Sequence, residues 1–272
     1  MRRSVTIAVI VQARMASTRL PGKILLDAGG RTFLSWVLQR CLLIPGVDVV
    51  CCATSSEPDC DPIAAEAERQ GAHVFRGSET DVLNRYRGAA DAVGADTVMR
   101  VTSDCPLIDP QTCGAVIDLL RSSGADYACN NMPSSWPHGL DCEAFSADVL
   151  RVADDTATAH DAREHVTPFL RTGAAFRQAS LPGPGGAWEQ LRWTLDTPDD
   201  HRFLSSFLPL LPGLSADFPT VGACLAAHPD LLHFCYRIGH ENRNEAHAPI
   251  QGTMPTFATQ LPNIAPMLET GR

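Results

Sequence analysis

A buried strand followed at once by a cationic loop opens this sequence and limits the folds available to it. Residues 5–11 form an apolar run rich in β-branched side chains, interrupted only by Thr6, which is typical of a strand covered on both faces of a parallel sheet. The polar segment after it contains two hydroxyls, three cations and a Pro-Gly turn, namely Arg14, Ser17, Thr18, Arg19, Gly22 and Lys23. The glycine lets the backbone approach an anion closely, and the cations offset its charge. We therefore predict an anion-binding loop at the carboxyl end of the first strand.

Lys23 is the only lysine among the 22 basic residues of the chain. A lysine supplies a compact, flexible point charge where an arginine would offer a planar fork, so a lysine kept inside this loop favours a phosphate site. A solitary lysine can equally arise by chance. The neighbouring Arg14 and Arg19 favour the functional interpretation.

Strand and helix patterns alternate over the first 130 residues. Apolar runs predict strands at residues 5–11, 48–54, 73–75, 97–101 and 126–129. Apolar positions at helical spacing predict helices at residues 31–43, 62–70, 81–93 and 111–122, with Ser78 or Thr80 as the cap of the third. This rhythm predicts an α/β fold with a doubly wound, mostly parallel sheet that binds ligands at the carboxyl ends of its strands.

The pattern changes after Asn130, where we expect a small mixed subdomain. Strands are predicted at residues 139–146, 175–181 and 190–195, and helices at residues 147–152 and 160–171, the second broken near Pro168. Helical patterns at residues 198–212 and 221–235 precede an irregular tail that begins at Glu241. We divide the chain into a main domain over residues 1–212, with the mixed subdomain at about 131–190, and a helical segment plus tail over residues 213–272.

The composition disfavours several classes of protein, among them nucleic-acid-binding, zinc-binding and membrane-spanning ones. A net charge of −9 disfavours broad nucleic-acid binding, which needs a basic face. The ten cysteines show no CxxC pair and no zinc-site spacing, so we expect reduced thiols that pack as small hydrophobic groups. No apolar stretch is long enough to span a membrane, and the N-terminal run continues into the cationic loop and does not read as a signal peptide. We expect a cytoplasmic protein.

Two aspartates each follow a predicted strand, and both are candidate metal ligands. Asp104 lies in the segment RVTSDCPLIDP and Asp196 in RWTLDTPDD. Carboxylates from two strand ends are a common way to hold Mg²⁺ against phosphates. Each could alternatively cap the helix that follows it, although Asp109 and Thr197 are better placed for capping.

The loop QARMASTRLPGK resembles the signature of the SpsF-like cytidylyltransferases, and more distantly those of the KDO and acylneuraminate cytidylyltransferases. The resemblance implies a nucleotide-diphospho-sugar transferase-like fold in which this loop wraps the triphosphate of CTP. It implies Mg²⁺ as cofactor, with Asp104 and Asp196 as its ligands and Arg14, Lys23, Asp104 and Asp196 as the catalytic set. The nucleotide-binding residues implied around the loop and the second strand end are Gln12, Ala13, Arg14, Ser17, Thr18, Arg19, Lys23, Thr102 and Ser103.

The segment RGSETDVLNRYRGAA resembles an element that lies against the nucleotide in this family. The resemblance adds Arg76, Ser78 and Asp81 to the expected nucleotide contacts. A capped helix with an exposed Arg85 is an alternative reading of the same residues. The preference for cytosine over uracil rests on the resemblance alone.

The segments SSWPHGLDCEAFS and HDAREHVTPF resemble the acceptor-binding part of the family. The resemblance implies acceptor contacts by His138, Asp141, Glu143, Arg163 and His165. His138 stands where the family pattern has arginine, which predicts an altered acceptor preference because histidine is shorter and only partly charged at neutral pH. His165 is either a general base or a packed histidine that bonds Glu143 or Asp141.

The resemblance, which extends to Arg243-Asn244-Glu245, implies transfer of CMP from CTP to a small anionic acceptor, with release of pyrophosphate. The implied acceptor is an acidic sugar of the nonulosonic type, or alternatively a phosphonate. A glycosyltransferase of the same sheet topology is a further alternative, which the lack of a DxD motif at Asp104 and Asp196 disfavours. A homodimer would fit such a sheet, but the sequence does not fix the oligomeric state.

Overall fold

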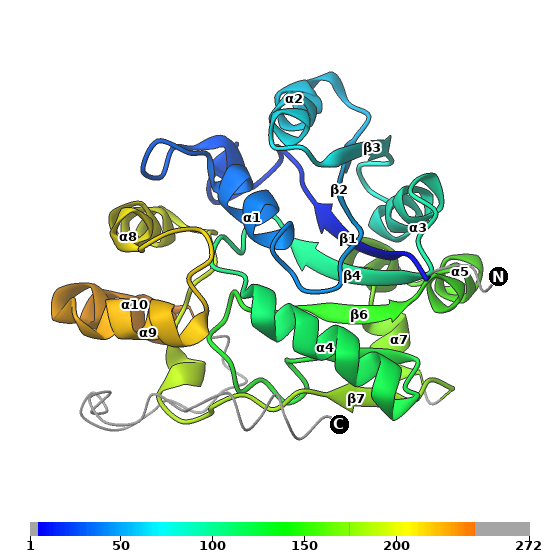
Figure 1. The fold of residues 1–272 in the computed structure, drawn as a ribbon. Coiled ribbons are helices and arrows are strands. Elements are labelled where there is room, and N and C mark those ends of the chain that lie inside the picture. Colours follow the sequence, from blue (N-terminus) through cyan, green and yellow to red (C-terminus); the bar gives the residue numbers. More distant parts are fainter. Residues whose placement is uncertain (1–4, 174, 243–272) are drawn as a thin grey trace.

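A twisted sheet forms the centre of the computed structural model, which describes residues 5–173 and 175–242. Within these residues the sheet has seven strands in the order β3-β2-β1-β4-β6-β5-β7 (Figure 1). Their bounds are β1 Ile7–Gln12, β2 Val49–Ser55, β3 His73–Gly77, β4 Thr97–Thr102, β5 Tyr127–Cys129, β6 Glu143–Ser146 and β7 Gln178–Ser180. Strands β1 to β4 are mutually parallel, whereas β6 runs antiparallel to both of its neighbours, β4 and β5.

Helices cover both faces of the sheet. Helices α1 (Phe33–Cys41) and α4 (Pro110–Ser123) lie on the near face in Figure 1, and α3 (Val82–Ala92) and α5 (Ala147–Thr156) lie behind it. Alternate residues of β1 therefore enter different cores: Val9 packs on the side of α1 and Ile10 on the side of α3. Helix α2 (Asp61–Arg69) connects β2 to β3. The predicted doubly wound, mostly parallel α/β fold is confirmed.

The mixed half of the chain differs from the prediction in two places. The strand predicted over residues 190–195 is wrong: a short 3-10 turn, Trp188–Gln190, leads into an extended segment whose backbone bonds loop residues and no named strand. Strand β6 begins only at Glu143, four residues after the predicted start at Gly139, which has φ 109°. The break predicted near Pro168 is confirmed: α6 (His160–His165) ends before Val166, which has φ 71°, and α7 (Pro168–Thr172) begins at the proline.

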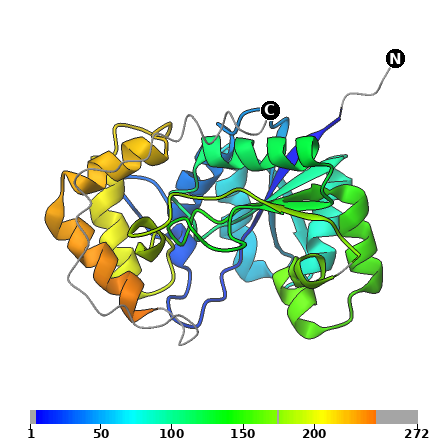
Figure 2. The same ribbon diagram turned by 90° about the horizontal axis from the view of Figure 1, so that it is seen from below.

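Three C-terminal helices lie beyond the carboxyl ends of β1 and β4 (Figure 2). They are α8 (Pro198–Phe207), α9 (Phe218–Ala226) and α10 (Pro229–Glu241). Arg40 of α1, which is fully buried, ties this region to the sheet by donating to the backbone oxygens of Ile108, Leu214 and Ala216 at 2.7–2.8 Å. The predicted irregular tail, with Arg243-Asn244-Glu245, lies outside the described residues apart from Glu241, which still belongs to α10, and Asn242, which caps this helix.

All ten cysteines are free thiols and nine of them are buried, in keeping with their predicted packing role. Burial raises the pKa of Cys52 to about 12, so this thiol stays protonated at neutral pH. Among the described residues no helix is both long and apolar enough to cross a membrane.

Candidate active site

The cationic loop leaves β1 and folds back on itself at Gly22. Gly22 has φ 65°, a conformation that glycine adopts without steric cost, and its backbone nitrogen donates to the Met15 oxygen at 3.1 Å. Lys23 then begins a short 3-10 turn, Lys23–Leu25. The turn directs the Lys23 side chain back across the carboxyl ends of the strands, where only 13% of it is exposed.

Asp104 is held by the chain that leads to Asp196. Its backbone oxygen accepts hydrogen bonds from the Leu195 nitrogen at 2.8 Å and the Thr194 hydroxyl at 3.1 Å. Its carboxylate does not cap α4, because Asp109 does so by accepting from the Thr112 nitrogen at 2.8 Å. The segment predicted as a strand over residues 190–195 thus brings the two aspartates together without joining the sheet.

Asp196 is positioned by Asp200, which is fully buried in the first turn of α8. The Asp200 carboxylate accepts from the backbone nitrogens of Asp196 and Thr197 at 2.9 and 2.8 Å, and Arg192 donates to it at 2.7 and 3.0 Å. Thr197 completes a capping box with Asp200. The Asp196 carboxylate is therefore not used for capping.

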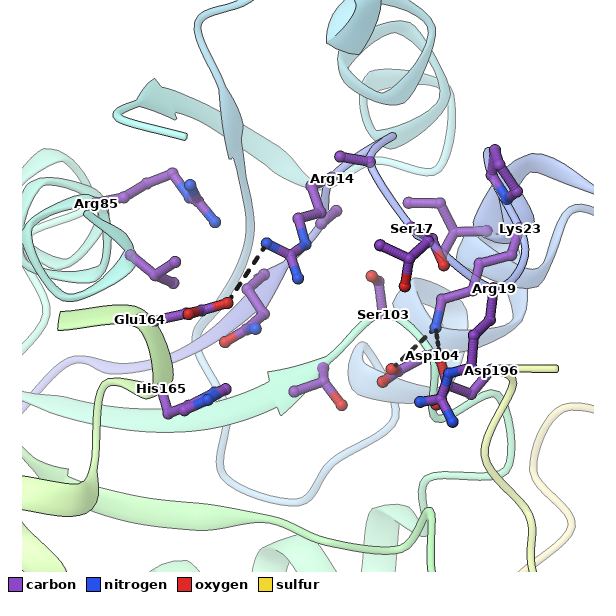
Figure 3. A pocket seen from close by; sticks show the side chains of 18 of the residues that line it. Arg14, Ser17, Arg19, Lys23, Arg85, Ser103, Asp104, Glu164, His165 and Asp196 are labelled. Atoms are coloured by element: carbon purple, nitrogen blue, oxygen red, sulfur yellow. Dashed lines mark hydrogen bonds and ion pairs between the residues drawn. The ribbon is translucent and has the colours of Figure 1, made fainter. Parts of the chain in front are cut away.

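Lys23 lies between the two aspartates, as Figure 3 shows. Its Nζ is 3.4 Å from Asp104 Oδ2 and 3.1 Å from Asp196 Oδ1, and Arg19 forms a further ion pair with Asp196. Burial raises the pKa of the Asp104 carboxyl, but the Lys23 ammonium and hydrogen bonds outweigh it and leave that pKa below its ordinary value. Both carboxylates thus face one point.

A cavity of about 710 Å³, which we call the first cavity, opens above this cluster. It is lined by the predicted loop residues Gln12, Ala13, Arg14, Ser17, Thr18, Arg19 and Lys23. At the end of β4 it is lined by Thr102, Ser103 and Asp104, and Asp196 completes the floor beside them. Figure 3 shows Lys23, Asp104 and Asp196 at one end of the cavity and Arg85, Glu164 and His165 at the other.

Arg76, Ser78 and Asp81, predicted as nucleotide contacts, do not line this cavity. Arg76 turns to the β2–α2 connection, where it donates to the Ser55 and Glu57 oxygens at 3.1 and 2.8 Å. Asp81 caps α3, a role predicted for Ser78 or Thr80, and pairs with Arg163 at 2.6 Å. The Ser78 hydroxyl accepts from the Asp81 nitrogen at 3.0 Å. These side chains shape the β3–α3 loop instead.

Arg85 does line the first cavity, so the alternative of an exposed arginine is wrong. It is 1% exposed and donates to the backbone oxygens of Ser78 and Glu79. Its position three residues after Val82, on the buried face of α3, was the available sequence signal. Glu164, 3.9 Å from Arg14, is a second lining residue that sequence reasoning missed.

A second cavity of about 450 Å³ adjoins the first. Arg19 and Asp196 line both cavities, so the two meet at the Lys23–Asp196 cluster. His138 and Asp141, two predicted acceptor contacts, line the second cavity with His138 Nδ1 3.5 Å from Asp141 Oδ2.

The other three predicted acceptor residues lie elsewhere. Glu143 is buried beneath the first cavity, where it pairs with Arg100 and accepts from the Tyr127 and Thr167 hydroxyls. Arg163 lines neither cavity, because Asp81 and Asp154 hold it at 2.6 and 2.7 Å. His165 lines the first cavity and lies 3.6 Å from Asp161, so it bonds neither Glu143 nor Asp141 as the packed alternative required.

The two aspartates suit a metal that takes its remaining ligands from phosphates and water. Within residues 5–173 and 175–242 no group of three or more His, Cys, Asp or Glu side chains could hold a metal ion. Mg²⁺ commonly binds through one or two carboxylates plus substrate phosphates, and Asp104 and Asp196 present two carboxylates to one point beside a cationic loop. The donor set therefore fits Mg²⁺ bound together with a nucleotide.

Comparison with known proteins identifies the relatives of this chain. A family model described as Cytidylyltransferase matches residues 8–200. The spore coat polysaccharide biosynthesis protein SpsF of Bacillus subtilis is 32% identical over 74% of this chain and 85% of its own. A 3-deoxy-manno-octulosonate cytidylyltransferase of Chelativorans is 35% identical over 76% of this chain and 79% of its own. A solved cytidylyltransferase from Leptospira borgpetersenii superposes with a TM-score of 0.80 at 28% identity, covering 90% of this chain and 100% of that one.

Proposed function

Since this chain belongs to the cytidylyltransferase family, we propose that its two joined cavities carry out Mg²⁺-dependent transfer of CMP from CTP to a small anionic acceptor, releasing pyrophosphate. One observation carries the proposal. Lys23 Nζ lies within 3.4 Å of carboxylates from two distant strand ends, at the point where a large cavity with a cationic loop meets a smaller one. A nucleotide in the first cavity and an acceptor in the second would have their reacting groups at this junction.

The loop side chains would bind and orient the triphosphate. Arg14, Arg19 and Lys23 supply positive charge and Ser17 a hydroxyl, so negative charge that develops on the phosphates is met by groups already in place. Mg²⁺ held by Asp104 and Asp196 would neutralise phosphate charge and lower the pKa of the acceptor hydroxyl. Catalysis of this kind consists of positioning and charge neutralisation, and it needs no protein nucleophile.

The second cavity would hold the acceptor, for which we propose an acidic sugar of the nonulosonic type. Arg19 and Arg192 line it, and His138 adds a third group that can carry positive charge, beside the carboxylates of Asp141, Glu189 and Asp196. The octulosonate named for the Chelativorans relative is a carboxylate sugar, which supports this choice. A phosphonate carries the same kind of charge and is the second candidate acceptor. A glycosyltransferase reaction is disfavoured, because neither aspartate lies in a DxD motif.

A pyrophosphate-release screen tests the proposed function. The protein is incubated with each nucleoside triphosphate against a panel of acidic sugars and phosphonates, with and without Mg²⁺. We expect release that requires CTP, Mg²⁺ and one acceptor class. Release with a neutral sugar only, or release that persists in excess chelator, would contradict the proposed acceptor or the metal, respectively.

A further inference from the structure

The first cavity has a chemically distinct end away from Lys23, where Figure 3 shows Arg85, Glu164 and His165. Gln12 and Thr102 are register partners on β1 and β4 and both line the cavity, as does Arg100. The triphosphate belongs at the opposite end, where Arg19, Lys23 and the two aspartates gather. If the proposed function holds, the base of the nucleotide lies towards the His165 end. Arg100 belongs to that side, because it pairs with Glu143, which also accepts from Thr167, two residues after His165.

Arg100 fixes which way the Gln12 amide points. Arg100 Nη2 donates to Gln12 Oε1 at 3.2 Å. A guanidinium carries five N–H donors and no acceptor, so the group of Gln12 that faces it must be the oxygen. Among the described residues, Gln12 Nε2 donates to no protein acceptor, which leaves a fixed N–H donor available at the base end of the cavity.

Glu143 in turn fixes Arg100. Arg100 Nη1 is paired with the Glu143 carboxylate, whose side chain is 2% exposed. Thr167 donates to Glu143 at 2.8 Å, and the Tyr127 hydroxyl donates to the same oxygen. Burial raises the pKa of Glu143, but the charge of Arg100 and these hydrogen bonds bring it below its ordinary value, so the pair stays ionised at neutral pH. Glu143 and Arg100 are positioning residues that restrict the Gln12 amide to one orientation.

We propose that Gln12 selects cytosine over uracil by donating from Nε2 to the ring nitrogen N3. In cytosine N3 is an acceptor, whereas in uracil it carries a hydrogen and would oppose the Gln12 donor. A site built around a hydrogen bond rejects an analogue that leaves its buried group unpaired. Glu143, predicted from sequence as an acceptor contact, thereby acts on base recognition through Arg100 and Gln12 and does not touch the base.

Gln12→Glu tests this assignment. The carboxylate would keep the contact with Arg100 but present an acceptor to the base in place of a donor. We expect the ratio of kcat/KM for CTP to that for UTP to fall by more than about 10-fold and to invert in favour of UTP, since one mispaired buried group changes affinity by about 10- to 100-fold. Gln12→Met, which is similar in size but has no amide, should lower the ratio without inverting it.

Glu143→Gln tests the positioning part, because Arg100 would lose its counter-charge and no longer fix Gln12. We expect a smaller CTP-to-UTP ratio, with the thermal unfolding midpoint reporting whether the fold persists. Should this variant fail to fold, the two Gln12 variants still decide the assignment. An unchanged ratio in Gln12→Glu, with CTP turnover retained, overturns it. Wild-type protein that releases pyrophosphate from no triphosphate would instead overturn the proposed function, and calorimetric dissociation constants for CTP and UTP would then test Gln12 alone.

Discussion

The backbone oxygen of Asp104 accepts a hydrogen bond from the backbone nitrogen of Leu195 at 2.8 Å. This bond links residues 91 positions apart, and Asp196 is the next residue after Leu195. It explains how two carboxylates from distant segments reach the same lysine. Contacts to the Asp104 backbone thus bring the two halves of the candidate site together.

Replacing Lys23 should stop turnover and spare the fold. Lys23→Ala removes the ammonium between Asp104 and Asp196, and loss of one preorganised charge-stabilising group typically costs about 10²–10³ in kcat. Steady-state pyrophosphate release measures this effect. Arg31→Ala, which removes an exposed cation outside both cavities, is the matched control and should leave kcat within about twofold. Near-normal turnover in Lys23→Ala would contradict the assignment of the loop.

Removing either carboxylate should remove the response to magnesium. Asp104→Asn and Asp196→Asn each keep the shape of the side chain but withdraw a charged ligand. We expect activity at saturating Mg²⁺ to fall by about 10²–10³-fold in each variant, as for the loss of one preorganised charge-stabilising group. Titration of pyrophosphate release with Mg²⁺ provides the measurement. If both variants kept the wild-type Mg²⁺ dependence, the metal would bind elsewhere.

The ion pair of Asp104 with Lys23 should appear in the pH dependence of stability. The pKa of Asp104 is lower in the folded protein than its ordinary value, so its contribution is present above the ordinary value and is lost as the pH falls through the folded pKa. Lys23→Ala removes the main charge that lowers this pKa. The free energy of unfolding, measured by urea denaturation at pH 5.5 and pH 3.5, should therefore decrease less on acidification in Lys23→Ala than in wild type. An identical decrease in the two proteins would show that Lys23 does not lower the pKa of Asp104.

Asp200 should matter more for stability than its exposed neighbour. Asp200→Asn leaves the buried Arg192 with Asp196, 3.6 Å away, in place of its closer partner, and weakens the bonds that hold Asp196 and Thr197. Breaking a buried ion pair from one side costs about 3–5 kcal/mol in the free energy of unfolding. Asp199→Asn removes a surface carboxylate whose nearest cation is 3.5 Å away, and should change stability by no more than about 0.5 kcal/mol. Equal effects of the two substitutions in urea denaturation would refute the role given to Asp200.

His138 should influence acceptor choice more than nucleotide binding. His138 lines the second cavity but not the first, so His138→Arg adds a permanent charge beside the acceptor alone. We expect the KM for an anionic acceptor to fall about 3- to 30-fold while the KM for CTP stays within about twofold. An acceptor profile identical to that of wild type would show that His138 does not contribute to acceptor binding.

The sequence predicts those parts of the candidate site that follow from the order of strands and loops along the chain. Carboxyl ends of parallel strands share one edge of a sheet, so a loop after β1 and an aspartate after β4 had to lie close together. Where a long side chain points depends on distant partners: Arg76 turns to Glu57 and Asp61, and Arg163 to Asp81, 82 positions away. Those partners are not visible in a local pattern, which is why the sequence did not show that Arg76 and Arg163 lie outside both cavities and that Arg85 lines the first.

The segment that carries Asp196 shows the same limit. Residues 190–195 have the apolar pattern of a strand, yet their backbone bonds His138 and Asp104 in loops and not a neighbouring strand. The spacing of apolar residues indicates which side chains are buried, but it does not indicate which groups the backbone forms hydrogen bonds with. Asp196 nevertheless lies beside Asp104, as expected, because the buried segment before it bonds the Asp104 backbone.

Anomalous diffraction from a crystal grown with Mn²⁺ and a non-hydrolysable CTP analogue tests the central claim most directly. One metal peak should be coordinated by both Asp104 and Asp196, with the triphosphate beside Lys23 and the base towards Gln12. A nucleotide bound with its metal on other residues, or with its phosphates away from Lys23, would contradict the account.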